Sequence, residues 1–410
     1  MTALARKLRE RGHEVFFVCL AEAEPMVRSV GLDFIPYGEA LFPAGEYPRR
    51  LRILSQLRGA EALQFTLSLF ADVCRAGLED GERVIRESRP EALVLDATSR
   101  GLNLVAMHLN LPFIQVSNAL HFDLSGHAPL CLYDWPHQPG PEGYARNIEG
   151  TKAFLRMSAP LVALERDYVA RVGLPVDVEN PMSHRSKLAQ LTQTPKEFDF
   201  PGDHWPAHFH YTGPWHDTSL RPPVDFPWDK LTGEPLIYAS MGTLQNGSER
   251  IFEAIVAAAQ TPGRQLVLSI GKNLDPDKIG TLSANTIVVR SAPQLEVLKR
   301  ASLCITHAGL NTVLESLTAG VPMVAIPVTN DQPGVGARIA HTGTGVVVPF
   351  KTFAGESASQ KLHEAIETVL TDRFYRENTQ RIQQAIEQTK GLCMAADLID
   401  YTLRGAVRPA

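Results

Sequence analysis

The sequence predicts an α/β protein of two Rossmann-like domains, each built on a parallel sheet, that face one another across a cleft. Two observations support this prediction. Short β-branched and apolar runs alternate with helical patterns along the chain, which is typical of parallel sheets covered by helices. In addition, 410 residues are too many for one hydrophobic core and suit two domains of about 200 residues each.

The first half contains four expected strands and one long amphipathic stretch. The strands cover residues 15–18, 34–35, 92–95 and 113–116, and the amphipathic stretch runs from about 51 to 87. A helix over residues 2–11 that closes on Gly12 comes before all of them. Because a parallel domain normally begins with a strand that becomes central in its sheet, we expect a strand and its loop upstream of Met1.

The second half repeats the alternation with more strands. They cover residues 236–239, 266–269, 287–289, 303–305, 323–326 and 346–348. The stretch 214–233 contains four prolines and has no periodicity, which is typical of a linker. We therefore expect a first domain over 1–213, a linker over 214–233, a second domain over 234–390, and a C-terminal helix over 391–410 that packs back on the first domain.

Composition excludes several classes of protein. A formal net charge of −5 argues against a nucleic-acid partner. The longest apolar runs, such as 323–328, are too short to cross a bilayer. Five scattered cysteines and the lack of a leader pattern favour a cytoplasmic protein. A helix over 48–58 carries four arginines among apolar residues, which suits either peripheral contact with an anionic membrane or plain solvent exposure.

The most informative segment joins a buried strand to a helix through a short loop. His307 ends the strand, Gly309 lies in the loop, and we expect the helix to begin at about Val313. Free backbone N–H groups and the helix dipole make such a loop an anion site, to which Asn311 and Thr312 add side-chain donors. Glu315 lies one turn further, where a carboxylate can accept the hydroxyls of a ribose. Alternatively, Thr312 and Glu315 form a capping box that needs no ligand.

Two more polar residues follow the next strand. Asp331 and Gln332 stand before Pro333, at the carboxyl end of the strand over 323–326. They could cap the helix that Pro333 opens. They could equally hold two hydroxyls of a sugar, and the residues alone do not decide between the two.

The donor-binding signature of family 1 UDP-glycosyltransferases resembles residues 291–339, which read SAPQLEVLKRASLCITHAGLNTVLESLTAGVPMVAIPVTNDQPGVGARI. Because this signature is long, its specificity is high. Weaker similarity extends over nearly the whole chain, through residues 11–15, 117–120, 133–136, 209–214 and 240–243. Within the family, the sequence looks most similar to bacterial zeaxanthin glucosyltransferases and macrolide glycosyltransferases.

This resemblance implies a GT-B fold, in which the first domain binds an acceptor and the second a nucleotide sugar. It implies contacts with the diphosphate by His307, Gly309, Asn311, Thr312, Gly242 and Thr243, with the nucleoside by Ala292, Gln294 and Glu315, and with the donor sugar by Asp331 and Gln332. At one position the sequence differs from the family. Ser291 stands where an aromatic residue often stacks on uracil, which removes one contact to the base.

The resemblance also implies an inverting reaction without a metal or other cofactor, because donors and a helix dipole can stabilise the leaving diphosphate. Asp96 matches the aspartate that orients a histidine base in this family, and that histidine is expected upstream of Met1. Alternatively, Asp96 caps the following helix. His121 and His127 fall in the segment expected to line the acceptor pocket, where either could act as a substitute base.

The function implied is transfer of a hexose, glucose from UDP-glucose, to a hydroxyl of a lipophilic small molecule such as a carotenoid, macrolide, sterol or phenol. Two alternatives keep the same fold. One is a sugar-nucleotide epimerase, which would need an acid and a base around the donor sugar. The other is a donor-binding relic that lacks the catalytic base.

Overall fold

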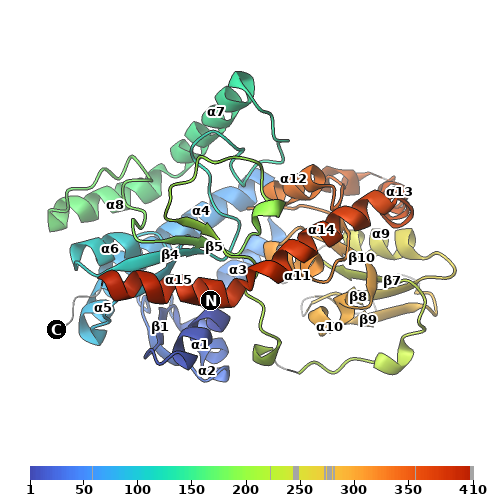
Figure 1. Ribbon diagram of the computed structural model, residues 1–410, viewed down its shortest axis with the longest axis horizontal. Coiled ribbons are helices and arrows are strands. Elements are labelled where there is room, and N and C mark those ends of the chain that lie inside the picture. Colours follow the sequence, from blue (N-terminus) through green and yellow to red (C-terminus); the bar gives the residue numbers. More distant parts are fainter. Residues whose placement is uncertain are drawn as a thin grey trace.

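The computed structural model shows two α/β lobes side by side, with the C-terminal helices running along both (Figure 1). It describes residues 1–406 except 58, 222, 243–248, 272–273, 275–278, 280–281 and 356. Thr243, one of the expected donor contacts, lies outside the described residues.

The second lobe is built on one continuous six-stranded sheet. Every neighbouring pair of strands is parallel, in the order β12-β11-β10-β7-β8-β9. The strands are β7 (Leu236–Ser240), β8 (Gln265–Ser269), β9 (Thr286–Val289), β10 (Ala301–Thr306), β11 (Met323–Ala325) and β12 (Gly345–Val347). The order changes direction at β7 and β10, so the carboxyl ends of these two strands mark the position where ligands bind in open parallel sheets.

Helices cover both faces of this sheet, because alternate strand residues point to opposite sides. Ile237 and Ile305 pack on one face, and Tyr238 and Cys304 pack on the other. The helices on the first face are α9 (Glu249–Ala259) and α13 (Ala358–Thr371). Those on the second face are α10 (Gln294–Leu298), α11 (Leu310–Thr318), α12 (Gln332–Thr342) and α14 (Arg373–Thr389).

The strands of the first lobe form two sheets. Four parallel strands follow the order β3 (Leu93–Asp96), β4 (Phe113–Ser117), β5 (Gln190–Thr192) and β6 (Phe209–Tyr211). A separate parallel pair consists of β1 (Phe16–Cys19) and β2 (Asp33–Pro36). Among the described residues, no strand pairing joins the two sheets. Our strand prediction did not include β5 and β6, because three residues carry no periodicity.

The helical stretch predicted over 51–87 is broken into several pieces. They are α3 (Glu46–Gln56), α4 (Gly59–Ala76), a wide turn (Gly77–Gly81) and α5 (Glu82–Ser88). At the wide turn, a Cβ on Gly81 would lie 3.0 Å from the side chain of Leu102, so a larger residue there would require Leu102 to shift. The other helices of this lobe are α1 (Thr2–Glu10), α2 (Glu24–Ser29), α6 (Leu102–His108), α7 (Pro141–Met157) and α8 (Ala159–Val172).

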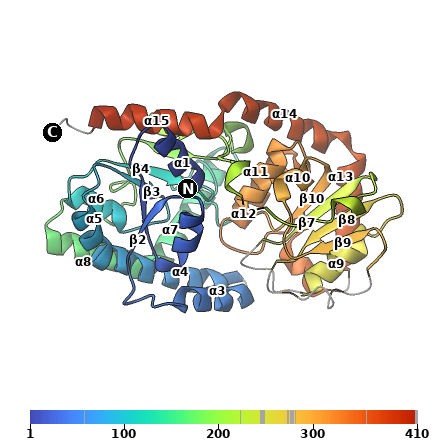
Figure 2. The ribbon, with the colours of Figure 1, turned by 90° about the horizontal axis from the view of Figure 1, so that it is seen from below.

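The last helix, α15 (Gly391–Ala406), returns to the first lobe and packs on α1 (Figure 2). Asp400 holds it there, with a carboxylate oxygen 2.7 Å from Nη1 of Arg11 and the other 2.6 Å from Nε2 of His13. The chain crosses itself closely where α15 begins. A Cβ on Gly391 would lie 2.0 Å from the carbonyl oxygen of Pro214, so this crossing requires glycine.

None of the helices in the described part of the chain is both long and apolar enough to span a membrane. In α3, Arg49 and Arg50 each lie 2.7 Å from Glu46, and Arg50 also lies 2.6 Å from Asp72. Arg58 lies outside the described residues. Two of the four arginines therefore serve local ion pairs, and peripheral membrane contact stays a prediction.

Candidate active site

The loop after β10 is the segment that the sequence predicts to bind an anion. α11 begins at Leu310 with Gly309 as its N-cap, three residues earlier than predicted, so Asn311 and Thr312 lie in its first turn. No side-chain hydrogen bond caps the helix. The capping-box alternative for Thr312 and Glu315 is therefore wrong, and the first N–H groups of α11 have no partner within the helix. Ala308 adopts a positive φ of 63° in the tight turn that precedes the helix.

His307 lies between two glycines. A Cβ on Gly242 would come within 2.5 Å of the His307 ring, and a Cβ on Gly309 would also come within 2.5 Å of it. Both glycines therefore make room for the imidazole, in addition to any approach to a phosphate. Burial lowers the pKa of His307 to about 4, against a smaller opposing effect of the Ser240 backbone. The ring is thus neutral at physiological pH.

Behind the first turn of α11, a polar cluster surrounds the carboxylate of Glu315, which is only 2% exposed. Nε2 of Gln294 donates to Oε2 of Glu315 at 2.6 Å and to Oγ1 of Thr312 at 3.3 Å. The hydroxyl of Tyr238, on β7, donates to Oε1 of Gln294 at 2.9 Å. The guanidinium of Arg221, which lies in the segment between the two lobes, pairs with the same carboxylate. Sequence reasoning missed Arg221 because no pattern relates it to a residue 94 positions away.

Several expected donor contacts already have partners from the first lobe. Nε2 of Gln193 donates to Oδ1 of Asn311 at 2.9 Å. The backbone N–H of Leu120 donates to Oδ2 of Asp331 at 3.1 Å. Burial raises the pKa of Asp331, and the Leu120 hydrogen bond opposes this shift. Ala292 packs, partly buried, on the core of the second lobe.

Asp331 and Gln332 have different local roles at the start of α12. Asp331 is the N-cap of α12, yet its side chain makes no capping hydrogen bond, so the capping alternative is wrong for this residue. Oε1 of Gln332 accepts from the backbone N–H groups of Val328 and Thr329 at 2.8 and 3.1 Å. Gln332 therefore stabilises its own loop, and Asp331 faces the first lobe.

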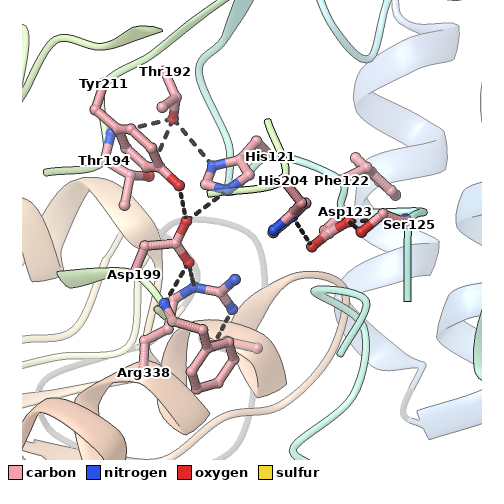
Figure 3. Close-up of polar contacts among 12 residues, drawn as sticks. His121, Phe122, Asp123, Ser125, Thr192, Thr194, Asp199, His204, Tyr211 and Arg338 are labelled. Carbon is pink, nitrogen blue, oxygen red and sulfur yellow. Dashed lines mark hydrogen bonds and ion pairs between the residues drawn. The ribbon is translucent and has the colours of Figure 1, made fainter. Parts of the chain in front are cut away.

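His121 is part of a buried network between the lobes (Figure 3). Its Nε2 lies 2.9 Å from Oδ2 of Asp199, and its Nδ1 lies 3.3 Å from Oγ1 of Thr192. Asp199 also accepts from Nε of Arg338 on α12 at 2.7 Å. Sequence reasoning missed Asp199 and Arg338, which lie 139 residues apart. His127, by contrast, is exposed and stacks on His204 with ring centroids 4.6 Å apart.

Asp96 ends β3, at the corresponding edge of the first lobe. Its Oδ1 accepts from the backbone N–H of Thr98 at 2.9 Å and from the Thr98 hydroxyl at 2.5 Å. The following helix, α6, begins at Leu102 with Gly101 as its N-cap, so the capping alternative for Asp96 is wrong. The amino group of Met1 lies near this carboxylate. Burial lowers the pKa of that amino group, and the charge of Asp96 opposes the shift.

In the described part of the chain, no three His, Cys, Asp or Glu side chains gather in a way that could hold a metal ion. The site instead offers backbone N–H groups, a neutral imidazole, amides and buried carboxylates. Such groups suit a ligand that combines an anion with hydroxyl groups.

The sequence matches the family model described as UDP-glucoronosyl and UDP-glucosyl transferase over residues 160–405. It is 28% identical to a zeaxanthin glucosyltransferase of Pantoea ananas, over 98% of this chain and 92% of the relative. It is 25% identical to the NDP-glycosyltransferase YjiC of Bacillus subtilis strain 168, over 99% of this chain and 94% of the relative.

Solved structures share the fold. The calicheamicin glycosyltransferase CalG4 matches with a TM-score of 0.75 and 22% identity, covering 100% of this chain and 95% of that chain. The glycotransferase of kitacinnamycin matches with a TM-score of 0.74 and 23% identity, covering 98% and 95%. These likenesses confirm the predicted fold class, the two-domain GT-B architecture.

Proposed function

Because the chain belongs to the UDP-glucoronosyl and UDP-glucosyl transferase family, we propose that it transfers glucose from UDP-glucose, with inversion, to a hydroxyl of a lipophilic small molecule. The observation that carries the proposal is the arrangement of His307, Gly309 and the N-terminus of α11 at the sheet's change of strand order. In this proposal, residues 1–213 hold the acceptor and residues 234–390 hold the donor.

The diphosphate would lie at the N-terminus of α11. This helix has nine residues, and its first N–H groups and dipole present positive charge to an anion. The neutral ring of His307 donates one N–H to a phosphate oxygen. Asn311 and Thr312 would add side-chain donors, because Gln193 and Gln294 donate to their oxygen atoms and do not occupy the Asn311 amide N–H groups or the Thr312 hydroxyl proton. No metal is required, because these groups carry the charge of the leaving group.

The nucleoside would lie over Glu315 and Gln294, and the sugar at Asp331. In this proposal, the carboxylate of Glu315, which Gln294 and Arg221 hold in place, accepts hydrogen bonds from ribose hydroxyls. Asp331, close to the first lobe, accepts hydrogen bonds from the sugar hydroxyls, with Gln332 beside it. Ser291 offers the base no aromatic ring, so the proposal rests on the diphosphate, the ribose and the sugar.

The reaction joins the two lobes. The acceptor hydroxyl loses its proton to a base while its oxygen attacks the anomeric carbon from the side opposite the diphosphate. The bond from that carbon to the diphosphate breaks, and UDP leaves with the electron pair. In this proposal, Asp96 orients the imidazole that acts as the base and favours its protonated form.

The acceptor proposed first is a carotenoid-like diol. Two relatives of 28% and 29% identity are named zeaxanthin glucosyltransferase, and each is aligned over 98% of this chain. Macrolides, sterols and phenols are further candidates. His121 and His127 are proposed acceptor-side residues, although His121 is buried in the network with Asp199.

The experiment is to incubate the chain with UDP-glucose and a panel of one carotenoid diol, one macrolide, one sterol and one phenol. The proposal expects UDP release only when an acceptor is present, together with a product heavier by one hexose. A sugar nucleotide inverted at C2 would indicate an epimerase instead. UDP binding without turnover of any acceptor would contradict transfer and indicate a donor-binding relic.

A further inference from the structure

One face of α12 docks onto the first lobe. Asp331, Gly334 and Arg338 lie three and four residues apart, so they occupy successive turns of the same face. Each contacts a different part of the first lobe. The N–H of Leu120 donates to Asp331 at 3.1 Å, the N–H of Gly334 donates to the carbonyl of Cys131 at 2.9 Å, and Arg338 donates to Asp199 at 2.7 Å.

The pair of Arg338 and Asp199 is almost completely buried, with side chains 1% and 4% exposed. The hydroxyl of Tyr211 donates to the other carboxylate oxygen at 2.6 Å, and Nε2 of His121 lies 2.9 Å from it (Figure 3). The guanidinium lies 4.4 Å from the centre of the Phe200 ring. Burial would raise the pKa of Asp199, but the charges of Arg338 and His121 outweigh it and lower that pKa. The carboxylate is therefore ionised, with both oxygens held.

A buried ion pair contributes little net stability, because removing two charges from water costs about as much as their attraction returns. Its distinctive effect is geometric, since the pair is satisfied only at one rotation and one position of α12. Nη1 of Arg338 also donates to the carbonyl of Gly334 at 3.1 Å, which ties the ion pair to the tight contact one turn earlier.

The contact at Gly334 leaves no room for a side chain. A Cβ there would lie 2.3 Å from the carbonyl oxygen of Cys131, which is backbone and cannot move aside cheaply. The helix and the loop over 118–134 therefore meet backbone to backbone. The same loop supplies the N–H of Leu120 that fixes the carboxylate of Asp331.

We propose that Arg338 and Asp199 are positioning residues that dock α12 on the first lobe and thereby aim Asp331 at the sugar of the donor. This inference rests on the proposed function, in which Asp331 binds that sugar. The nucleotide contacts differ in origin, because His307, Gln294 and Glu315 all belong to the second lobe. Recognition of the sugar therefore depends on docking of the lobes, whereas recognition of UDP does not.

The test measures binding of UDP, UDP-glucose and UDP-galactose to the full chain by calorimetry. Galactose differs from glucose only in the configuration of one hydroxyl group. The ratio of the affinities for UDP-glucose and UDP-galactose therefore reports how precisely the sugar is bound. In Arg338→Met and in Gly334→Ala, the preference for UDP-glucose should fall about tenfold, which corresponds to the loss of one well-placed hydrogen bond. The affinity for UDP should stay within about twofold of the unchanged protein, because its contacts are intact.

Two control variants match these changes in chemistry. Arg264→Met removes a cation from an ion pair within the second lobe, the one with Glu367. Gly355→Ala adds a methyl group where the nearest atom is 3.8 Å away. Both should keep the sugar preference, and the thermal midpoint of each variant identifies any that fails to fold.

Gly334→Ala keeps every charge, so it decides the question if Arg338→Met does not fold. An unchanged sugar preference in folded Gly334→Ala, or a loss of UDP affinity in parallel with UDP-glucose affinity, would overturn the positioning role. Failure of the proposed function gives a different result, because the unchanged protein would then not bind UDP-glucose or would show no preference between the two sugars.

Discussion

The carboxyl-end edges of the two main sheets differ in what they present. In the second lobe, the loops after β7, β10 and β11 bring Gly242, His307 and Asp331 to one edge of a continuous sheet. In the first lobe, the strands fall into two sheets, and Asp96 at the end of β3 receives its hydrogen bonds, within the described residues, from Thr98. In the proposed function, donor binding and transfer therefore depend on different lobes, and we expect mutations to separate them.

The largest expected effect is at Asp96, where a substitution should reduce turnover without weakening UDP binding. Asp96→Asn keeps the shape of the side chain but removes the charge that orients and stabilises an imidazolium. Turnover should fall about 100-fold or more, the range typical of a lost general base, and UDP affinity should stay within about twofold. Steady-state kinetics and calorimetry on the same sample measure both.

Asp177→Asn is the matched control, because Asp177 makes a similar local turn by accepting from the N–H of Glu179 at 3.1 Å. It should leave turnover unchanged. Parallel losses of turnover and UDP affinity in Asp96→Asn would refute the assignment of Asp96 to transfer.

The second effect is at His307, where a substitution should weaken UDP binding itself. His307→Ala removes a donor to a charged phosphate oxygen, a contact of about 1.5–3 kcal/mol, so UDP affinity should fall about 10- to 100-fold. His363, half-exposed in the same lobe, provides the control His363→Ala. If both variants bind UDP equally well, the diphosphate does not lie at this loop.

A smaller effect tests the ribose contact. Glu315→Gln replaces a buried carboxylate acceptor by an amide, which should weaken binding of UDP about tenfold. The unchanged protein should prefer UDP to 2′-deoxy-UDP, and Glu315→Gln should lose this preference. A preference that persists in Glu315→Gln would place the ribose elsewhere.

The sequence predicted the strand, loop and helix that carry the candidate site and missed the contacts between distant residues. The segment over 303–339 revealed a strand, a loop, a helix and the acid–amide pair, because each feature is encoded in neighbouring residues. The partners of that segment are remote in sequence. Arg221 reaches Glu315 and Asp199 reaches Arg338 only after the lobes have packed, and neither pair leaves a periodic signal.

Other features of the site depend on packing and leave no signal in neighbouring residues. The structure shows that Gly309 and Gly242 make room for the His307 ring. The start of α11 was predicted three residues late, because the Gly309 N-cap has no side chain to mark it. The strands β5 and β6 were not predicted from the sequence, because they are too short to show a periodic pattern.

The smallest effect concerns a feature that the two lobes share, a buried neutral histidine in each. Burial, with the charges of Arg100 and Arg185, lowers the pKa of His184 to about 4, as burial does for His307. Between pH 6.5 and 4, each of these histidines is protonated in the unfolded chain but stays neutral in the folded chain. The free energy of unfolding should therefore fall as pH falls through this window, by about 1 kcal/mol per histidine from pH 8 to 5.5.

Denaturant titrations at pH 8 and 5.5 measure this loss. The free energy of unfolding of His184→Gln should fall by about 1 kcal/mol less than that of the unchanged chain over the same interval, because glutamine does not titrate. The exposed His127 supplies the control His127→Gln, which should behave like the unchanged chain. Equal losses in His184→Gln and the unchanged chain would mean that His184 does not resist protonation.

The most direct test of the central claim locates UDP on the chain by amide hydrogen exchange. Saturating UDP should slow exchange of the amides over 309–312 at the N-terminus of α11, because phosphate oxygens accept from those N–H groups. Amides over 96–100, after β3, should exchange at unchanged rates. Unchanged exchange over 309–312, or protection confined to the edge that carries Asp96, would contradict donor binding by the second lobe.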